Sequence, residues 1–197
     1  YPDLAGKKAL VCMNVRASSS VNGEITLSAK SFNTDVNHEI APVYQTVTVR
    51  KGDNLFEMEL PMGQDFLIWD EFSPALYRLT ATLKNGKQIE TKQIQFGMRE
   101  FTINGKWFYI NGRKTMLRGT VENCDFPLTG YAPMDVASWE RVFRICRSYG
   151  LNHMRFHSYC PPEAAFIAAD LVGFYLQPEG PSWPSHGPKL GNGQPID

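Results

Sequence analysis

The sequence predicts a multi-domain fold with a β part and an α/β part. An immunoglobulin-like β-sandwich is expected over residues 1–97, followed by the first two to three βα units of an incomplete (β/α)8 barrel over residues 98–197. Two observations predict this fold. Apolar and polar residues alternate in several short segments of the first half, as in the strands of a sandwich. In the second half, strand patterns alternate with helical ones, as in βα units.

Short alternating segments make up most of the first part. They are KALVCMNVRA, GEITLSAKS, VYQTVTVR, NLFEMEL, LYRLTATL and KQIETKQIQF. Asn-Gly pairs at 22–23 and 85–86 predict hairpin turns, because both residue types tolerate a positive φ. Trp69 precedes a late strand and is expected to be a core or corner aromatic residue. Six or seven strands in about 100 residues are typical of an immunoglobulin-like sandwich.

The pattern changes after residue 97. Asn-Gly pairs at 104–105 and 111–112 predict a tight hairpin, which leads into a strand over residues 115–122. Leu117 and Val121 are expected on one face of that strand. Its other face is expected to be polar and to carry Arg118, Thr120 and Glu122.

A helix is expected over residues 136–149, where apolar residues recur at helical spacing. Asp135 is placed to cap its N-terminus, and Gly150 follows its end. A second helix is expected to begin at Pro162, whose missing N–H has no partner in a first turn, and to end at Gly173.

Two strands flank this second helix, at residues 153–158 and 174–179. In the first, Arg155 and His157 are expected to share one face, while Met154 and Phe156 share the other. An open doubly wound sheet buries two apolar faces, whereas a barrel directs one face into its lumen. The polar face therefore favours a barrel.

Eight βα units in about 250 residues form a closed barrel, so the sequence is expected to be part of a longer protein. An isolated half-barrel exposes strand edges and apolar surface, and we expect it to self-associate.

Composition excludes several classes of function. Twenty Lys and Arg balance twenty Asp and Glu, so no charge footprint for nucleic acid or for an anionic membrane is present. The four cysteines form no CxxC pair, which argues against a zinc ribbon or redox motif. No apolar run approaches the ~20 residues of a membrane span.

Two stretches of the sequence resemble glycoside hydrolase family 2, the group of β-galactosidases, β-glucuronidases and β-mannosidases. The first contains Phe96-Gly97-Met98-Arg99, the turn Asn111-Gly112 and the strand Leu117-Arg118-Gly119. The second is LNHMRFHSYCPPEAAFIAADLVGFYLQPEGPSW. The resemblance covers most of the chain and implies a sandwich that leads into a catalytic barrel.

The resemblance also implies an activity for the parent protein: hydrolysis of terminal O-glycosidic bonds in oligo- or polysaccharides by a retaining mechanism with two glutamates. In the family the acid/base glutamate directly follows an asparagine, and this sequence contains no Asn-Glu pair. We therefore assign no catalytic residue here and expect this chain alone to be inactive. No cofactor is expected, although the complete enzyme could hold a divalent or sodium ion. A periplasmic or secreted bacterial location is favoured.

Three candidate residues for sugar binding lie on the strands of the second part. By resemblance, Arg155 lies near the nucleophile, where a guanidinium keeps a carboxylate ionised and oriented. His157 could donate a hydrogen bond to a sugar hydroxyl, and Glu179 could bind a hydroxyl or an ion. The alternatives are a structural arginine, a core histidine and a solvated carboxylate.

Further candidates lie in loops. Trp183 could stack on a sugar ring or pack internally, while Asn123 and Asp125 could bind sugar or form a turn. His186 is a weaker candidate. We expect no metal site in this chain, because His153 and His157 would lie ~13 Å apart along a strand.

Two other classes of function remain open. The chain could be a non-catalytic module that binds carbohydrate or protein. It could also be an adhesin-like sandwich with an unrelated α/β tail, but polar inward faces on three consecutive strands argue against that reading.

Overall fold

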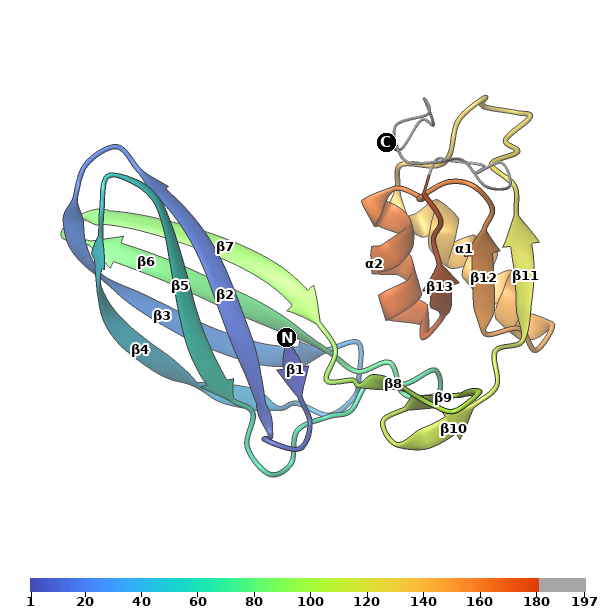
Figure 1. The fold of residues 1–197 in the computed structure, drawn as a ribbon, viewed down its shortest axis with the longest axis horizontal. Helices are drawn as coiled ribbons and strands as arrows, with labels where there is room; N and C mark the ends of the chain where they lie inside the picture. The colour runs from blue at the N-terminus through green and yellow to red at the C-terminus, as the bar shows by residue number, and fades with distance from the viewer. Residues whose placement is uncertain (181–197) are drawn as a thin grey trace. The chain divides into compact units, whose positions relative to one another are not determined.

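A computed structural model describes residues 1–180 of the protein (Figure 1). Trp183 and His186 therefore lie outside the described residues. The chain forms two compact units, Tyr1–Thr115 and Met116–Asp197. Residues 98–115, which the sequence groups with the second part, cluster with the first unit.

Two antiparallel sheets form most of the first unit (Figure 1). One contains β1 (Pro2–Asp3), β2 (Lys8–Ala17) and β5 (Gly52–Pro61), in the order β1-β2-β5. The other contains β3 (Val21–Phe32), β4 (Glu39–Val49), β6 (Leu76–Asn85) and β7 (Gln88–Phe96), in the order β4-β3-β6-β7. The predicted all-β character of this part is confirmed.

A single apolar core joins the two sheets. Val11 and Leu60 from the first sheet are buried in one cluster with Ile25 and Leu27 from the second. These residues alternate with more exposed ones along their strands, which is the pattern of a sheet with one buried face.

One predicted turn is wrong. The Asn-Gly pair at 22–23 lies inside β3, where Gly23 is paired with Val47. A Cβ atom on Gly23 would lie 2.8 Å from the carbonyl oxygen of Lys84 on the neighbouring strand. This glycine therefore permits a close backbone approach, and the chain turns at 18–20 instead. The predicted turn at 85–86 is confirmed between β6 and β7.

A small antiparallel sheet completes the first unit. It contains β8 (Phe101–Asn104), β9 (Trp107–Ile110) and β10 (Arg113–Thr115), in the order β10-β9-β8. Both predicted Asn-Gly turns connect these strands, with positive φ at Gly105 and Gly112. The single strand predicted over 115–122 is wrong, because Thr115 ends β10 and the next strand begins at Gly119.

The Phe96–Arg99 segment packs against Trp69, which is fully buried as predicted. The backbone N–H of Trp69 donates to the carbonyl of Met98 at 3.0 Å, and the Arg99 guanidinium lies 4.5 Å from the indole centroid. A Cβ on Gly97 would lie 2.7 Å from the Trp69 Cβ. Packing against Trp69 therefore explains why a glycine occupies this position.

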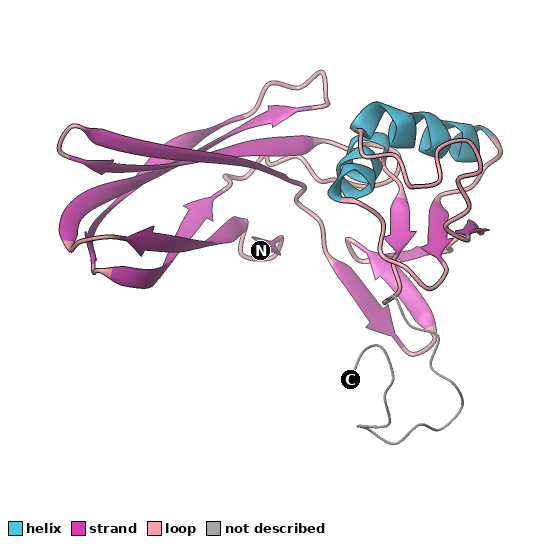
Figure 2. Ribbon diagram, turned by 90° about the horizontal axis from the view of Figure 1, so that it is seen from above, coloured by secondary structure: helices cyan, strands magenta, loops and turns pink. Residues whose placement is uncertain are grey.

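The second unit is a parallel sheet with helices on one face (Figures 1 and 2). Its elements are β11 (Gly119–Glu122), α1 (Val136–Ser148), β12 (His153–Phe156), α2 (Glu163–Val172) and β13 (Tyr175–Gln177). The strand order is β11-β12-β13, and both pairings are parallel. The predicted succession of strand, helix, strand, helix and strand is confirmed.

The helix boundaries largely follow the predicted signals. Asp135 is the N-cap of α1 and accepts a 2.8 Å hydrogen bond from the Ser138 N–H. Gly173 ends α2 in the left-handed region at φ 75°. Pro162, predicted as the first helical residue, is instead the N-cap, because its ψ of 157° is extended.

Aromatic side chains build the core of the second unit. Phe143 of α1 is fully buried and stacks on Trp139 and Phe174, with ring centroids 5.7 and 4.9 Å away. Met154 and Phe156 of β12 join the same cluster, so this face of the sheet meets the helices. In residues 1–180, neither helix has the length and apolar character needed to cross a membrane.

Candidate functional site

The candidate site lies where the three parallel strands end. Because β11, β12 and β13 run in the same direction, the residues that follow them gather at one edge of the sheet. Arg155 is on the face opposite Met154 and Phe156, which pack on the helices, so the predicted alternation of β12 is confirmed. β12 ends at Phe156 rather than at Ser158, where φ is 64°.

The predicted alternation of β11 is confirmed, because Val121 lies on one face and Thr120 and Glu122 on the other, but the expected inward orientation of the polar face is wrong. Val121 is the register partner of Arg155, whereas Thr120 and Glu122 are the partners of Met154 and Phe156. Paired residues of a parallel sheet share a face, so Thr120 and Glu122 lie on the helix side. The inward face is therefore not polar on all three strands.

The register of β11 depends on a residue far away in the sequence. Asn152 is 2% exposed, and its side-chain oxygen accepts a 2.7 Å hydrogen bond from the Arg118 N–H. The Asn152 N–H in turn donates to the Arg118 carbonyl at 2.9 Å. These bonds fix the start of β11 against β12. The four residues of β11 have mixed polarity, so their sequence alone does not determine this register.

Arg155 and Glu179 form an ion pair at this edge. The Arg155 Nε donates to Glu179 Oε1 at 2.5 Å, and the Ser158 N–H donates to Oε2 at 2.9 Å. The Arg155 hydrogen bond, and next the Ser158 N–H, hold the pKa of the Glu179 carboxyl below its usual value. The side chains are 40% and 27% exposed, so solvent screens the pair, and it orients the guanidinium more than it stabilises the fold.

His157 and Asn123 form a second pair. The His157 Nδ1 lies 3.1 Å from the amide oxygen Oδ1 of Asn123. That oxygen only accepts, so Nδ1 carries the proton, and Nε2 of a neutral ring is an acceptor. The structure thus brings together two residues that the sequence predicts separately, from the ends of β12 and β11.

Asp125 takes part in a turn. Its N–H donates to Glu122 Oε1 at 3.3 Å, and Cys124 between them has a φ of 58°. The backbone of Asp125 therefore belongs to a turn, which was one of its two predicted roles. Its carboxylate as a sugar ligand stays a prediction.

Glu122 was not among the predicted site residues. Burial raises the pKa of its carboxyl, against the opposing effect of nearby backbone N–H groups. Among the described residues, its buried Oε2 has no hydrogen-bond partner. Its position as the last residue of a strand that ends at this edge was the available signal.

Trp183 and His186 are not placed, because they fall outside residues 1–180. Within that described range, no three His, Cys, Asp or Glu side chains gather as metal ligands.

Comparison with known proteins identifies the family. Residues 1–99 match the model of "Glycosyl hydrolases family 2". The chain belongs to this family. The resemblance seen in the sequence is therefore confirmed.

Relatives within glycosyl hydrolase family 2 are much longer than this chain. A β-galactosidase from Thermoanaerobacterium thermosulfurigenes is 30% identical over 131 residues, which are 66% of this chain and 18% of that protein. A putative β-glucuronidase from Formosa agariphila is 32% identical over 117 residues, 58% of this chain and 14% of that protein. The chain thus spans less than a fifth of each of these relatives.

A solved structure shows the same fold. Bacteroides uniformis β-glucuronidase 2, covalently bound to cyclophellitol-6-carboxylate aziridine, superposes with a TM-score of 0.73 over 93% of this chain and 23% of its own. Sequence identity is 20%, so this likeness concerns the fold alone.

Proposed function

We propose that this chain is the immunoglobulin-like sandwich and the first βα units of the (β/α)8 barrel of a retaining glycosidase. The complete protein hydrolyses terminal O-glycosidic bonds of oligo- or polysaccharides. One observation carries this proposal: Arg155, oriented by Glu179, lies at the C-terminal edge of a parallel sheet in a family 2 chain. Catalytic groups of (β/α)8 barrels collect at that edge.

The arrangement of helices supports the barrel. Both helices cover one face of the β11-β12-β13 sheet (Figure 2). Arg155 occupies the opposite face, where a barrel has its lumen. A doubly wound sheet would need helices and apolar residues on both faces.

Arg155 suits the role of holding the nucleophile. Its ion pair with Glu179 uses Nε, and the two terminal nitrogens carry four of the five guanidinium donors. In the complete barrel those donors would hydrogen-bond the nucleophilic carboxylate. They would keep it ionised and aim it at the anomeric carbon.

Glu179 is unsuited to acid catalysis. A general acid needs a raised pKa so that it keeps its proton near neutral pH. Arg155 and the Ser158 N–H lower the pKa of Glu179 instead. We therefore assign Glu179 to positioning Arg155. Glu122 has a raised pKa but lies on the helix face of the sheet as the partner of Phe156, and the chain contains no Asn-Glu pair, so both catalytic glutamates are proposed to lie outside this chain.

His157 and Asn123 fit the recognition of uncharged sugar hydroxyls. Their hydrogen bond orients the ring and favours the tautomer in which Nε2 is an acceptor, which is the group that a sugar hydroxyl would bind. Trp183 remains a predicted stacking residue, and the Asp125 carboxylate remains a predicted hydroxyl ligand.

Aryl β-galactosides, β-glucuronides and β-mannosides test the proposal directly. The full-length gene product is expected to hydrolyse at least one of them, and this chain alone none. In the full-length protein, Arg155→Lys should lower kcat/KM by roughly 100-fold, because a lysine lacks the planar donor fork. The matched control Arg16→Lys, at an 86% exposed side chain of the sandwich, should leave it unchanged.

Two outcomes would contradict this assignment. Turnover by this chain alone would mean that its own carboxylates suffice. A full-length protein that hydrolyses none of the three classes but binds glycans would favour an accessory binding module.

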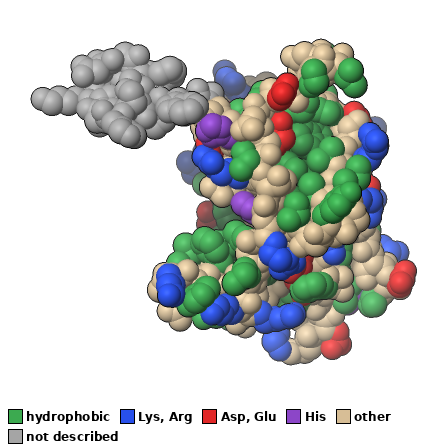
Figure 3. All heavy atoms as spheres, turned by 90° about the vertical axis from the view of Figure 1, so that its right-hand side faces the viewer, with side chains coloured by type: hydrophobic (Ala, Val, Ile, Leu, Met, Phe, Trp, Pro, Cys, Tyr) green, Lys and Arg blue, Asp and Glu red, His purple; other side chains and the backbone are tan. Residues whose placement is uncertain are grey.

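We also propose that the isolated chain self-associates. Hydrophobic side chains reach the surface in Figure 3, and in the second unit Leu128, Met134 and Tyr131 are 98%, 71% and 65% exposed. Apolar surface of this kind favours association in water. Light scattering after size exclusion should give a mass above 22.3 kDa, and a monodisperse monomer would overturn the proposal.

A further inference from the structure

One face of the small sheet β8-β9-β10 is polar and aromatic. Paired residues of an antiparallel sheet share a face, and the register groups five residues on this one. They are Thr102, Asn104, Trp107, Tyr109 and Lys114. Together with Lys106 of the adjoining turn, they form what we call the Trp107 face. Apolar rings lie on the opposite face, where the centroids of Phe101 and Phe108 are 5.4 Å apart.

Two lysine ammonium groups lie at the same indole on the Trp107 face. Lys114 Nζ is 3.2 Å and Lys106 Nζ is 5.3 Å from the ring centroid of Trp107. Attraction between a cation and the π face of the indole holds each ammonium there. Within residues 1–180, neither ammonium forms an ion pair with a carboxylate. The two like charges repel each other, and an anion that contacts both would relieve that repulsion.

The segment that forms this sheet has no acidic residue. Residues 101–115 contain Lys106, Arg113 and Lys114 but no Asp or Glu. Arg113 belongs to the opposite face, as the register partner of Ile110. Because the whole chain carries no net charge, the positive charge is a local feature of this sheet and not of the protein surface in general.

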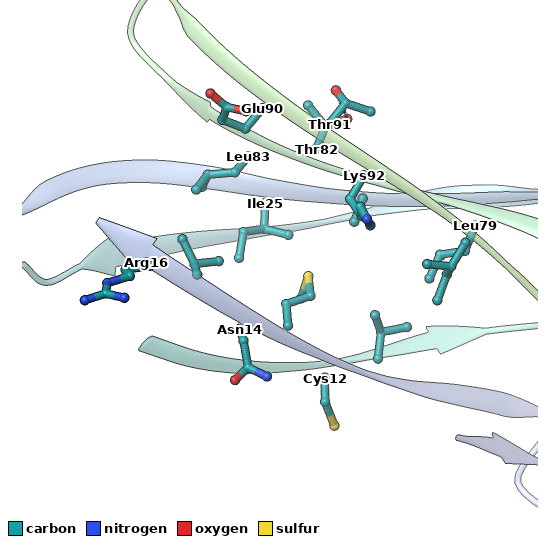
Figure 4. A pocket seen from close by; sticks show the side chains of 15 residues that line it. Cys12, Asn14, Arg16, Ile25, Leu79, Thr82, Leu83, Glu90, Thr91 and Lys92 are labelled. Carbon is teal, nitrogen blue, oxygen red and sulfur yellow. Dashed lines mark hydrogen bonds between the residues drawn. The ribbon is translucent and has the colours of Figure 1, made fainter. Parts of the chain in front are cut away.

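Cations elsewhere in the first unit lie beside carboxylates. Figure 4 shows Arg16, Glu90 and Lys92 along the open groove between the two sheets of the sandwich, so both signs of charge line that groove. Arg16 also lies 3.6 Å from Asp53. The groove therefore offers no excess of positive charge to an anion, in contrast to the Trp107 face.

Hydrogen bonds organise the small sheet in the absence of a ligand. The side-chain oxygen of Asn111 accepts from the Glu100 N–H at 2.8 Å, and its amide nitrogen donates to the Trp69 carbonyl at 2.9 Å. The backbone N–H of Asn111 donates to the Glu100 carbonyl, also at 2.9 Å. These bonds fix the turn between β9 and β10 against the buried Trp69. A ligand of the Trp107 face thus meets a backbone that is already ordered, which lowers the entropic cost of binding.

We propose that the Trp107 face binds a sulfated glycan. A sulfate ester presents several outward acceptor oxygens, so it can contact the ammonium groups of Lys106 and Lys114 at once. Lysine acts as a point charge toward such an oxyanion, whereas the planar fork of arginine is the better match for a carboxylate. The Trp107 face has two lysines and no arginine, which favours a sulfate over a uronate.

The remaining side chains of this face suit the sugar ring itself. Trp107 is 37% exposed, and with the half-buried Tyr109 it offers apolar surface to the C–H groups of a pyranose. Thr102 and Asn104 are exposed and supply a hydroxyl and an amide for sugar hydroxyls. This binding concerns the first unit alone and does not depend on the proposed glycosidase activity.

Calorimetric titration of the full-length protein tests the proposal. The probes are short dextran sulfate chains, uncharged dextran of the same length and oligogalacturonate, and only dextran sulfate is expected to bind. The double variant Lys106→Ala/Lys114→Ala should weaken binding at least roughly tenfold, because charge-assisted hydrogen bonds are lost. The matched control Lys51→Ala/Lys87→Ala removes two exposed lysines of the sandwich and should change the affinity less than about twofold, because distant exposed charges are screened.

Lysine acetylation of the unaltered protein gives a second measurement, which needs no variant to fold. Dextran sulfate should slow the acetylation of Lys106 and Lys114, read by mass spectrometry, and leave the rates at Lys51 and Lys87 unchanged.

Three results would overturn the proposal. One is an equal loss of affinity in both double variants, or equal protection of all four lysines, because either would mean general attraction of a polyanion. Another is binding of oligogalacturonate as tight as that of dextran sulfate. The third is no binding of dextran sulfate at all.

Discussion

Replacing Gly97 by alanine should destabilise the sandwich unit through a specific clash. The new Cβ would lie 2.7 Å from the Trp69 Cβ and 2.9 Å from its Cγ. Trp69 has no exposed surface, and its backbone N–H, bonded to the carbonyl of Met98, holds the main chain of the two segments together. The indole therefore has little room to move away.

The size of the effect follows from two opposing contributions. Overpacking a well-packed site costs about 1–3 kcal/mol. Gly97 does not adopt a positive φ, so alanine also restricts the unfolded chain, which returns about 0.4–1 kcal/mol. The middle of each range gives a net loss in the free energy of unfolding of about 1.3 kcal/mol, or roughly 3–5 °C in Tm.

Thermal unfolding followed by circular dichroism measures this loss. Gly180→Ala is the matched control, because its Cβ would meet nothing within 4 Å and its φ is not positive. That control should change stability by less than about 0.5 kcal/mol. If Gly97→Ala unfolds within about 1 °C of the control, steric exclusion by Trp69 is not the reason for this glycine.

Three further predictions concern the second unit. Phe143→Ala should lower the free energy of unfolding by about 3–5 kcal/mol, because the fully buried ring stacks on two aromatic neighbours. Ile145→Ala, at a position that is 48% exposed, is the control and should lower it by less than about 0.5 kcal/mol. Urea unfolding measures both losses. Burial raises the pKa of Glu122 in the folded protein. The contribution of its protonated carboxyl to stability is therefore lost as pH rises from 4.5 through the pKa of the folded state. Glu122→Gln should raise Tm at pH 7 but not at pH 4. The pKa of Glu179 is lowered in the folded protein, so the stabilisation from its ion pair with Arg155 is present above pH 4.5 and is lost as pH falls through the pKa of the folded state. Glu179→Gln should remove that acid transition when Tm is measured as a function of pH. An unchanged dependence of Tm on pH would contradict the pairing.

Much of the fold is encoded locally. Alternation along β2, β3 and β5, helical spacing in α1 and the Asn-Gly turns at 104–105 and 111–112 depend on neighbouring residues, and the predictions drawn from them are confirmed. Asp135 and Gly173 likewise act within their own helix termini. Such features follow from backbone geometry and hydrogen bonding within a few residues.

The failures depend on contacts between distant segments. The Asn-Gly pair at 22–23 looks like the other turn signals, but Gly23 serves a close approach to Lys84 in the next strand. The inward direction of the polar face was predicted from a strand over residues 115–122, whereas the bonds of Asn152 set the register of the shorter β11 against β12 and so decide which face is inward.

The candidate site likewise has features that neighbouring residues determine and others that depend on contacts between distant segments. The orientation of Arg155 could be predicted from the sequence, because alternation along β12 places it away from the apolar core, whereas His157 follows the end of that strand. The pairing of Arg155 with Glu179 and of His157 with Asn123 joins strand ends that are 24 and 34 residues apart. Only the parallel register brings these ends together, because hydrogen bonds between strands, and not the sequence spacing, set which side chains meet.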